Sequence, residues 1–146
     1  MPVPAPAEGP GLHLTLTRDT AELARLAGEV ERFLERHPRL LPAANAVQLA
    51  LEELVSNVIR HADARGARLR IDVHVAPGAD GVRIAIEDDG QAFDPLAHGA
   101  PDVDAPLDER TVGGLGIHLV RNIATDLAYA RRDGRNRLEL LIPLPD

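Results

Sequence analysis

The sequence predicts an α+β domain with two layers, in which one mixed, mostly antiparallel β-sheet carries helices on one face. Alternating apolar residues indicate strands near both ends of the chain, and two helical patterns separate the first strand from the next. Strands and helices do not alternate regularly, which disfavours a doubly wound parallel sheet. With 146 residues, of which 45% are apolar, the chain suits one domain with a single core.

The first strand and the first two helices follow from apolar periodicity. Leucine at every second position over residues 12–16 is typical of a half-buried strand. A helix capped by Asp19 or Thr20 and ending near His37 is expected next, because apolar residues recur there at helical spacing. A second helix is expected over residues 42–62, with its proline in the first turn.

Two hairpins complete the predicted sheet. Apolar residues alternate over 69–75 and again over 82–86, and the segment 77–81 between them has the composition of a turn. Near the C-terminus, Asp133-Gly134 separates two further strands, the second of which ends near residue 143. These strands belong to the same predicted sheet.

Three segments fall outside the strands and the first two helices. Residues 1–10 are rich in proline and are expected to form a flexible tail before a single domain over 11–146. Residues 91–112 are rich in Pro, Gly and Asp and lack periodicity, which predicts a functional lid. A third helix is expected to begin at the glycines that follow this lid.

Composition excludes several classes of function. The net charge of −7 and the absence of Trp disfavour direct contact with nucleic acid. The chain has no Cys, which favours a reducing, cytoplasmic location, and it has no apolar run long enough for a membrane span. All 16 basic residues are Arg, so any phosphate site must work without the lysine that P-loops and protein kinases use.

Glu53 and Asn57 form the first candidate site. They are four residues apart in the second predicted helix, so their side chains lie one turn apart on the same side, and His61 continues the row. A carboxylate can accept a hydroxyl proton, and an amide oxygen suits Mg²⁺. The pair therefore indicates a catalytic base and a metal ligand, although a solvated polar helix face would have the same residues.

Asp88 and Gly90, at the end of a predicted strand, form the second candidate site. A carboxylate there can accept a hydrogen bond from an exocyclic amine, and the adjacent glycine lets a flat base approach the main chain. We therefore expect adenine recognition, with Phe93 in the same segment. An ordinary Asp-Gly turn is the alternative interpretation.

The segment Gly113-Gly114-Leu115-Gly116 is the third candidate site. Free main-chain amides and the helix dipole at a helix start favour phosphate, and this start is the best anion site in a chain without lysine. A glycine hinge for the lid explains the pattern equally well. Arg110, just upstream, has a charge that could reach a terminal phosphate, although a single loop arginine is commonly only solvated.

The order of these motifs resembles that of the GHKL ATPases, the superfamily of gyrase, histidine-kinase, heat-shock chaperone and mismatch-repair nucleotide domains. LEELVSNVIRHA (51–62) resembles their N-box, IEDDGQAFDP (86–95) their adenine box and GGLGIHLVRN (113–122) their phosphate box. Within that superfamily the chain is similar to the short anti-sigma factor serine kinases of bacteria, the RsbW-like type, in its length, its N-terminal strand and its closing GRNRLEL.

The resemblance implies the Bergerat fold of these ATPases, with ATP and Mg²⁺ as cofactors. It implies that Glu53 is the general base, that Asn57 binds Mg²⁺, that Asp88 recognises adenine and that Gly114 and Gly116 contact phosphates. The chain departs from the family at position 92, where Ala replaces a common glycine, and Arg110 lies further from the glycines than the similar lid-end arginine does.

The resemblance also implies a function. The chain would phosphorylate a serine of an anti-anti-sigma partner of the STAS type, and the unphosphorylated partner would compete with a sigma factor for it; a homodimer is expected. Two alternatives remain: an ATP-dependent partner-switching module without catalysis, and a histidine-kinase-like ATPase domain detached from its other domains.

Overall fold

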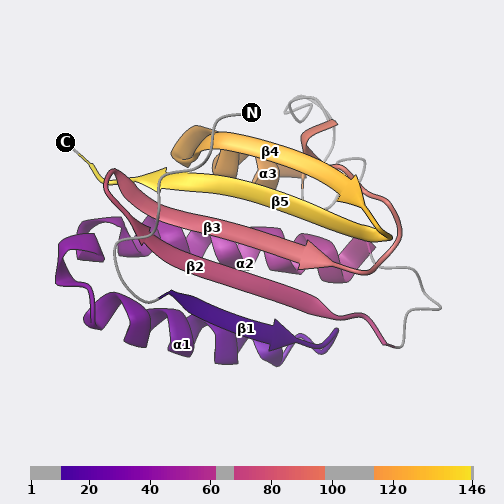
Figure 1. Cartoon of the computed structure of the whole chain (residues 1–146), viewed down its shortest axis with the longest axis horizontal. Coiled ribbons are helices and arrows are strands. Elements are labelled where there is room, and N and C mark those ends of the chain that lie inside the picture. The colour runs from indigo at the N-terminus through magenta and orange to yellow at the C-terminus, as the bar shows by residue number, and fades with distance from the viewer. Residues whose placement is uncertain (1–10, 62–67, 98–113, 146) are drawn as a thin grey trace.

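The five strands form one sheet in the order β1-β2-β3-β5-β4 (Figure 1). The computed structural model describes residues 11–61, 68–97 and 114–145, so the predicted tail and lid residues 98–112 lie outside the described part. The strands are β1 (Leu12–Leu16), β2 (Ile71–Gly78), β3 (Gly81–Asp88), β4 (Thr125–Arg132) and β5 (Arg135–Pro143). The helices are α1 (Glu22–Glu35), α2 (Ala44–His61) and α3 (Gly114–Ile123), with 3₁₀ turns at Pro38–Ala43 and Pro95–Ala97.

The predicted fold class is confirmed. The three helices lie on the same side of the sheet in Figure 1, which gives a helical layer and a sheet layer. All four strand pairings that the structure describes are antiparallel, so the sheet is more regular than the mixed sheet that was expected. The helical layer places one face of the sheet in the core and leaves the other open.

The core lies between the sheet and the helices, and the strand alternation sets it. Leu14, Val73, Ile86 and Leu138 occupy one row across four strands, and the last three are buried. α2 contributes a row of apolar side chains that are almost fully buried, among them Val47 at 0% exposure. Each such side chain contributes about 1.5–3 kcal/mol through burial, so these rows fix which strand faces point inward.

The structure corrects three predicted boundaries. α1 begins at Glu22, and the predicted cap Asp19 instead accepts a hydrogen bond from the amide of Ala21 in the turn before the helix. Pro42 lies in the 3₁₀ turn before α2 and not in its first α-helical turn. The turn between β2 and β3 is shorter than predicted, since Pro77 pairs with Val82.

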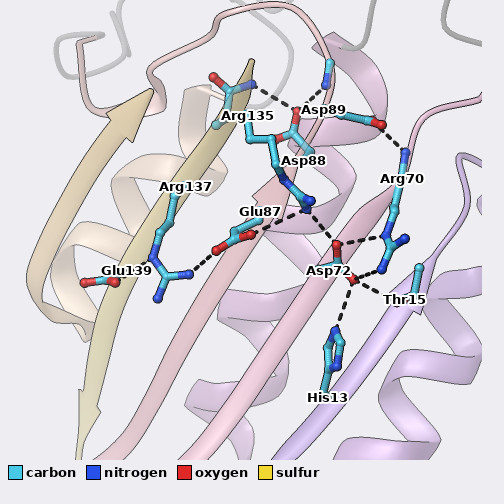
Figure 2. Close-up of polar contacts among 12 residues, drawn as sticks. His13, Thr15, Arg70, Asp72, Glu87, Asp88, Asp89, Arg135, Arg137 and Glu139 are labelled. Atoms are coloured by element: carbon cyan, nitrogen blue, oxygen red, sulfur yellow. Dashed lines mark hydrogen bonds and ion pairs between the residues drawn. The ribbon is translucent and has the colours of Figure 1, made fainter. Parts of the chain in front are cut away.

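The open face of the sheet carries a set of charged side chains around Asp72 (Figure 2). Asp72 is 4% exposed. Its carboxylate accepts hydrogen bonds from Thr15 Oγ1 at 2.7 Å and from Arg135 Nη2 at 2.6 Å, and it also contacts Arg70 and His13. The ion pairs continue across β3 and β5 through Glu87, Arg137 and Glu139.

The pKa of Asp72 follows from these contacts. Burial by itself raises the pKa of this carboxyl, but the hydrogen bonds from Arg135, Thr15, Arg70 and His13 outweigh burial and hold the pKa well below its usual range. Asp72 is therefore an ionised, structural residue of the open face.

None of the helices that the structure describes combines the length and apolar character needed to cross a lipid bilayer.

Candidate functional site

A cavity lies between the C-terminal part of α2, the end of β3 and strands β4 and β5. Three residues predicted from the sequence, Asn57, Asp88 and Phe93, contribute to its wall. They come from separate elements, and the fold brings them together. The complete lining is Leu54, Asn57, Val58, His61, Ile86, Asp88, Gln91, Phe93, Pro95, Tyr129, Asn136 and Leu138.

Asp88 is buried at the end of β3, with 6% of its surface exposed. It continues the inward alternation of Ile84 and Ile86, which directs its carboxylate toward the helical layer. Oδ1 accepts hydrogen bonds from Asn136 Nδ2 at 3.0 Å and from the Gly90 amide at 2.9 Å. Burial raises the pKa of Asp88, and these two hydrogen bonds oppose that shift without cancelling it.

The segment after β3 contacts the end of α2. The ring of Phe93 stacks on that of His61, with 4.0 Å between ring centroids and 12° between ring planes. Gln91 Nε2 donates to the main-chain oxygen of His61 at 2.7 Å. The carbonyl of Gly90 accepts a hydrogen bond from Arg131 Nη1 at 2.8 Å, so this segment also contacts β4.

The polar row of α2 faces the cavity and α3. Asn57 is 4% exposed, although it is a polar residue on a helix. Among the residues that the structure describes, none makes a hydrogen bond with its side chain, so the amide can serve a ligand. Glu53 lies one turn earlier and is partly buried. This geometry differs from the solvated helix face that the sequence also allowed.

Glu53 lies against the first turn of α3. A Cβ atom placed on Gly116 would come within 2.0 Å of Oε2 of Glu53, so only glycine leaves room for the carboxylate there. The helix begins at Gly114, as the glycine pattern indicates. Of the remaining predicted residues, Arg110 and Gly113 lie outside the described residues, and the structure gives Leu115 a place in α3 without describing its side chain.

Sequence reasoning missed Asn136, the most buried polar contact of Asp88. Asn136 is 6% exposed and lies opposite Asp88 in the pairing of β3 with β5. One signal was present in the sequence, because Asn136 occupies the inward position of a strand whose next inward residues are Leu138 and Leu140. A polar residue in such a row needs a partner inside the protein.

The donor set fits a metal that arrives with a nucleotide. Within the described ranges, no group of three His, Asp or Glu side chains could hold a metal ion unaided. Mg²⁺ commonly takes one or two protein oxygens and completes its shell with phosphates and water. The amide oxygen of Asn57, inside the cavity and one turn from Glu53, is a donor of that kind.

Comparisons with known proteins identify the class of domain that this fold and cavity define. The family model described as the histidine kinase-like ATPase domain matches residues 16–142, and the chain belongs to this family. The resemblance to GHKL ATPases is thereby confirmed, and the domain is of the ATP-binding type that this family describes.

Individual relatives agree with this assignment. The serine/threonine-protein kinase BtrW of Bordetella bronchiseptica is 34% identical over 92 residues, which cover 63% of this chain and 65% of that protein, less than two thirds of its length. Two structures of the blue-light activated histidine kinase EL346 of Erythrobacter litoralis are also similar. Its histidine kinase domain has a TM-score of 0.52 at 20% identity, over 85% of this chain and 60% of that one. A second chain has a TM-score of 0.50 at 24% identity, over 70% and 30% respectively. These structures show the fold alone.

Proposed function

We propose that this chain is an anti-sigma factor kinase that transfers the γ-phosphoryl group of Mg-ATP to a serine or threonine of an anti-anti-sigma protein of the STAS type. One observation carries the proposal: Asn57 and Asp88 share one cavity, and Glu53 lies beside it against the start of α3. The name of the BtrW relative supports a hydroxyl acceptor. We also propose that the chain regulates a sigma factor, forms a homodimer and acts in the cytoplasm.

Different residues would bind the base, the metal ion and the phosphates of the nucleotide. Asp88, in the cavity wall, accepts a hydrogen bond from the exocyclic amine of adenine, and Phe93 contacts the base. Asn57 holds Mg²⁺, which neutralises phosphate charge when it is bound. The main-chain amides at the start of α3, from Gly114 onward, would bind the phosphates, because a helix N-terminus favours anions.

Glu53 performs the proton transfer. The hydroxyl oxygen of the acceptor attacks the γ-phosphorus, a new O–P bond forms, and the bond to the β–γ bridging oxygen breaks so that ADP leaves. The hydroxyl proton passes to the carboxylate of Glu53. Because Glu53 lies against Gly116 at the start of α3, its carboxylate is near the phosphate that the helix start would hold.

The substitution Glu53→Gln tests this assignment, with Glu52→Gln as a matched control. Glu52 is the adjacent, exposed carboxylate of α2, so the control removes the same charge from the same helix. Each variant is incubated with γ-labelled ATP and a STAS protein encoded beside it. We expect Glu53→Gln to bind ATP as the wild type does and to lower transfer at least about a hundredfold, the usual scale for a lost base. Glu52→Gln should transfer normally.

Other outcomes separate the alternatives. Undiminished transfer by Glu53→Gln would contradict the base assignment. A wild-type protein that binds ATP and captures the STAS protein but transfers no label is a binding module without catalysis. Label on a histidine of a partner, in place of serine or threonine, would assign the domain to histidine-kinase chemistry.

A further inference from the structure

The side chain of Asn136 makes four hydrogen bonds at the cavity wall. It lies on β5 at the position opposite Asp88, and its two amide hydrogens go to different partners. Nδ2 donates to Asp88 Oδ1 at 3.0 Å and to the main-chain oxygen of Gln91 at 2.9 Å. Oδ1 accepts from the Phe93 amide at 3.3 Å and from the hydroxyl of Tyr129. One side chain therefore joins the end of β3, the following segment and β4.

These four contacts fix the orientation of the Asn136 amide. Its NH₂ faces a carboxylate and a carbonyl, which only accept hydrogen bonds, while its oxygen faces an N–H and an O–H. Rotating the amide by half a turn would oppose donor to donor at Phe93 and acceptor to acceptor at Asp88. Since only 6% of the residue is exposed, water reaches little of it, and the observed orientation is strongly preferred.

The orientation of Asn136 determines which oxygen of Asp88 is available. Oδ1 accepts from Asn136 and from the Gly90 amide, so both described hydrogen bonds to the carboxylate use the same oxygen. Among the described residues, none donates to Oδ2. A carboxylate held at one oxygen by two donors cannot rotate freely, and its second oxygen keeps a fixed direction.

We propose that Asn136 is a positioning residue for nucleobase recognition: it holds Oδ1 of Asp88 so that Oδ2 accepts the exocyclic amine of the base, and through Gln91 and Phe93 it holds the adjoining segment. This inference rests on the proposed binding of ATP at Asp88. It assigns the preference for an amine-bearing purine to a pair of residues, Asp88 and Asn136, that are 48 positions apart in the sequence.

The experiment compares ATP with purine riboside triphosphate, which lacks only the exocyclic amine. Binding to the full chain is measured by calorimetry for the wild type, Asn136→Ala and a control, Gln48→Ala. The control loses a hydrogen bond between α2 and α1, from Nε2 to the oxygen of Ala27, and lies outside the cavity. We expect the wild type and Gln48→Ala to prefer ATP by about ten- to a hundredfold, as for one hydrogen bond to a charged group.

Asn136→Ala should bring that preference to less than about threefold, because the carboxylate is no longer held, while affinity for the analogue changes little. General damage to the site would weaken both nucleotides by the same factor and keep their ratio, and that result would overturn the inference. If the wild type binds neither nucleotide, the proposed binding of ATP is refuted. That outcome differs from the one in which the wild type prefers ATP and Asn136→Ala keeps the same ratio of affinities for ATP and the analogue.

A second pair of variants keeps the test decisive if Asn136→Ala does not fold. Asn136→Thr and Asn136→Val have nearly the same shape and suit a β-strand, but only threonine has a hydroxyl to donate to Asp88. We expect Asn136→Thr to retain most of the preference for ATP and Asn136→Val to lose it. Equal preferences in the two variants would overturn the inference.

Discussion

The carboxylate of Glu53 on α2 lies in direct contact with the main chain of Gly116 on α3. A Cβ atom at position 116 would come within 2.0 Å of Oε2 and 2.8 Å of Cδ, distances that no packed pair of atoms allows. Gly116 therefore has a role besides the phosphate contact that its motif suggests. It leaves the space that the candidate catalytic base occupies.

Replacing Gly116 with alanine should displace Glu53 and slow phosphoryl transfer. A displacement of about 1 Å in a catalytic group can reduce the rate about a hundredfold. Since Asp88 and Asn57 are unaffected, ATP affinity should change much less than the rate of transfer to a STAS protein. Single-turnover transfer and calorimetric binding, measured on the same preparation, separate the two quantities.

Gly28 provides the control for that substitution. It lies within α1, and the nearest atoms to a Cβ placed on it are those of the Arg32 guanidinium at 3.8 Å. Gly28→Ala should therefore keep full transfer and raise the free energy of unfolding by about 0.5–1 kcal/mol, the usual gain in a helix interior. Equal transfer rates in Gly116→Ala and Gly28→Ala would contradict the role assigned to Gly116.

Asp88→Asn should weaken ATP binding by about ten- to a hundredfold. The substitution keeps the shape but replaces a charged acceptor with an amide, and a hydrogen bond to a charged group contributes about 1.5–3 kcal/mol. The buried Nδ2 of Asn136 would also lose its carboxylate partner. Calorimetric titration with Mg-ATP measures the effect, with Asp89→Asn as the control because Asp89 is exposed. Unchanged affinity in Asp88→Asn would remove Asp88 from the nucleotide site.

Tyr129 should report nucleotide binding by its fluorescence. The chain has one Tyr and no Trp, and this single Tyr contributes to the cavity wall and donates its hydroxyl to Asn136. A base that enters beside Asp88 changes the surroundings of the ring, so tyrosine emission should change and saturate with Mg-ADP. Titration at the red edge of tyrosine absorption, corrected with free tyrosine, measures the change. An emission that follows the free-tyrosine control at every concentration would place the nucleotide elsewhere.

Local patterns in the sequence predicted the strands, the helices and most of the candidate residues. The alternation of Val82, Ile84 and Ile86 was enough to define β3, and Asp133-Gly134 indicated a hairpin turn that the structure has, with φ of 55° and 76° at these residues. These signals depend on neighbours within a few residues, which a sequence shows directly.

Non-local pairing is what the sequence did not show. Asn136 reaches Asp88 only because β5 pairs with β3 in a register that sets the two residues opposite each other. Alternation defines the faces of each strand but does not say which strands are neighbours. The contact between Glu53 and Gly116 likewise depends on how α2 packs on α3, which the helical periodicity of each segment leaves open.

Asp72, on the open face, should make stability depend on pH in the acidic range. Its pKa in the folded state lies below the unfolded value near 3.8, so the unfolded state takes up the proton first on acidification. The stabilisation is present above that unfolded pKa and is lost as the pH falls through it toward the folded pKa.

Asp72→Asn should cost about 2 kcal/mol of unfolding free energy at pH 7 through the loss of charged hydrogen bonds, and it should flatten the decline in stability below about pH 5. Urea unfolding between pH 3.5 and 7 measures both effects, with Glu139→Gln as the control because the Glu139 side chain is 50% exposed. Coincident stability curves for the wild type and Asp72→Asn would show that the ion pairs of Asp72 in Figure 2 do not stabilise the fold.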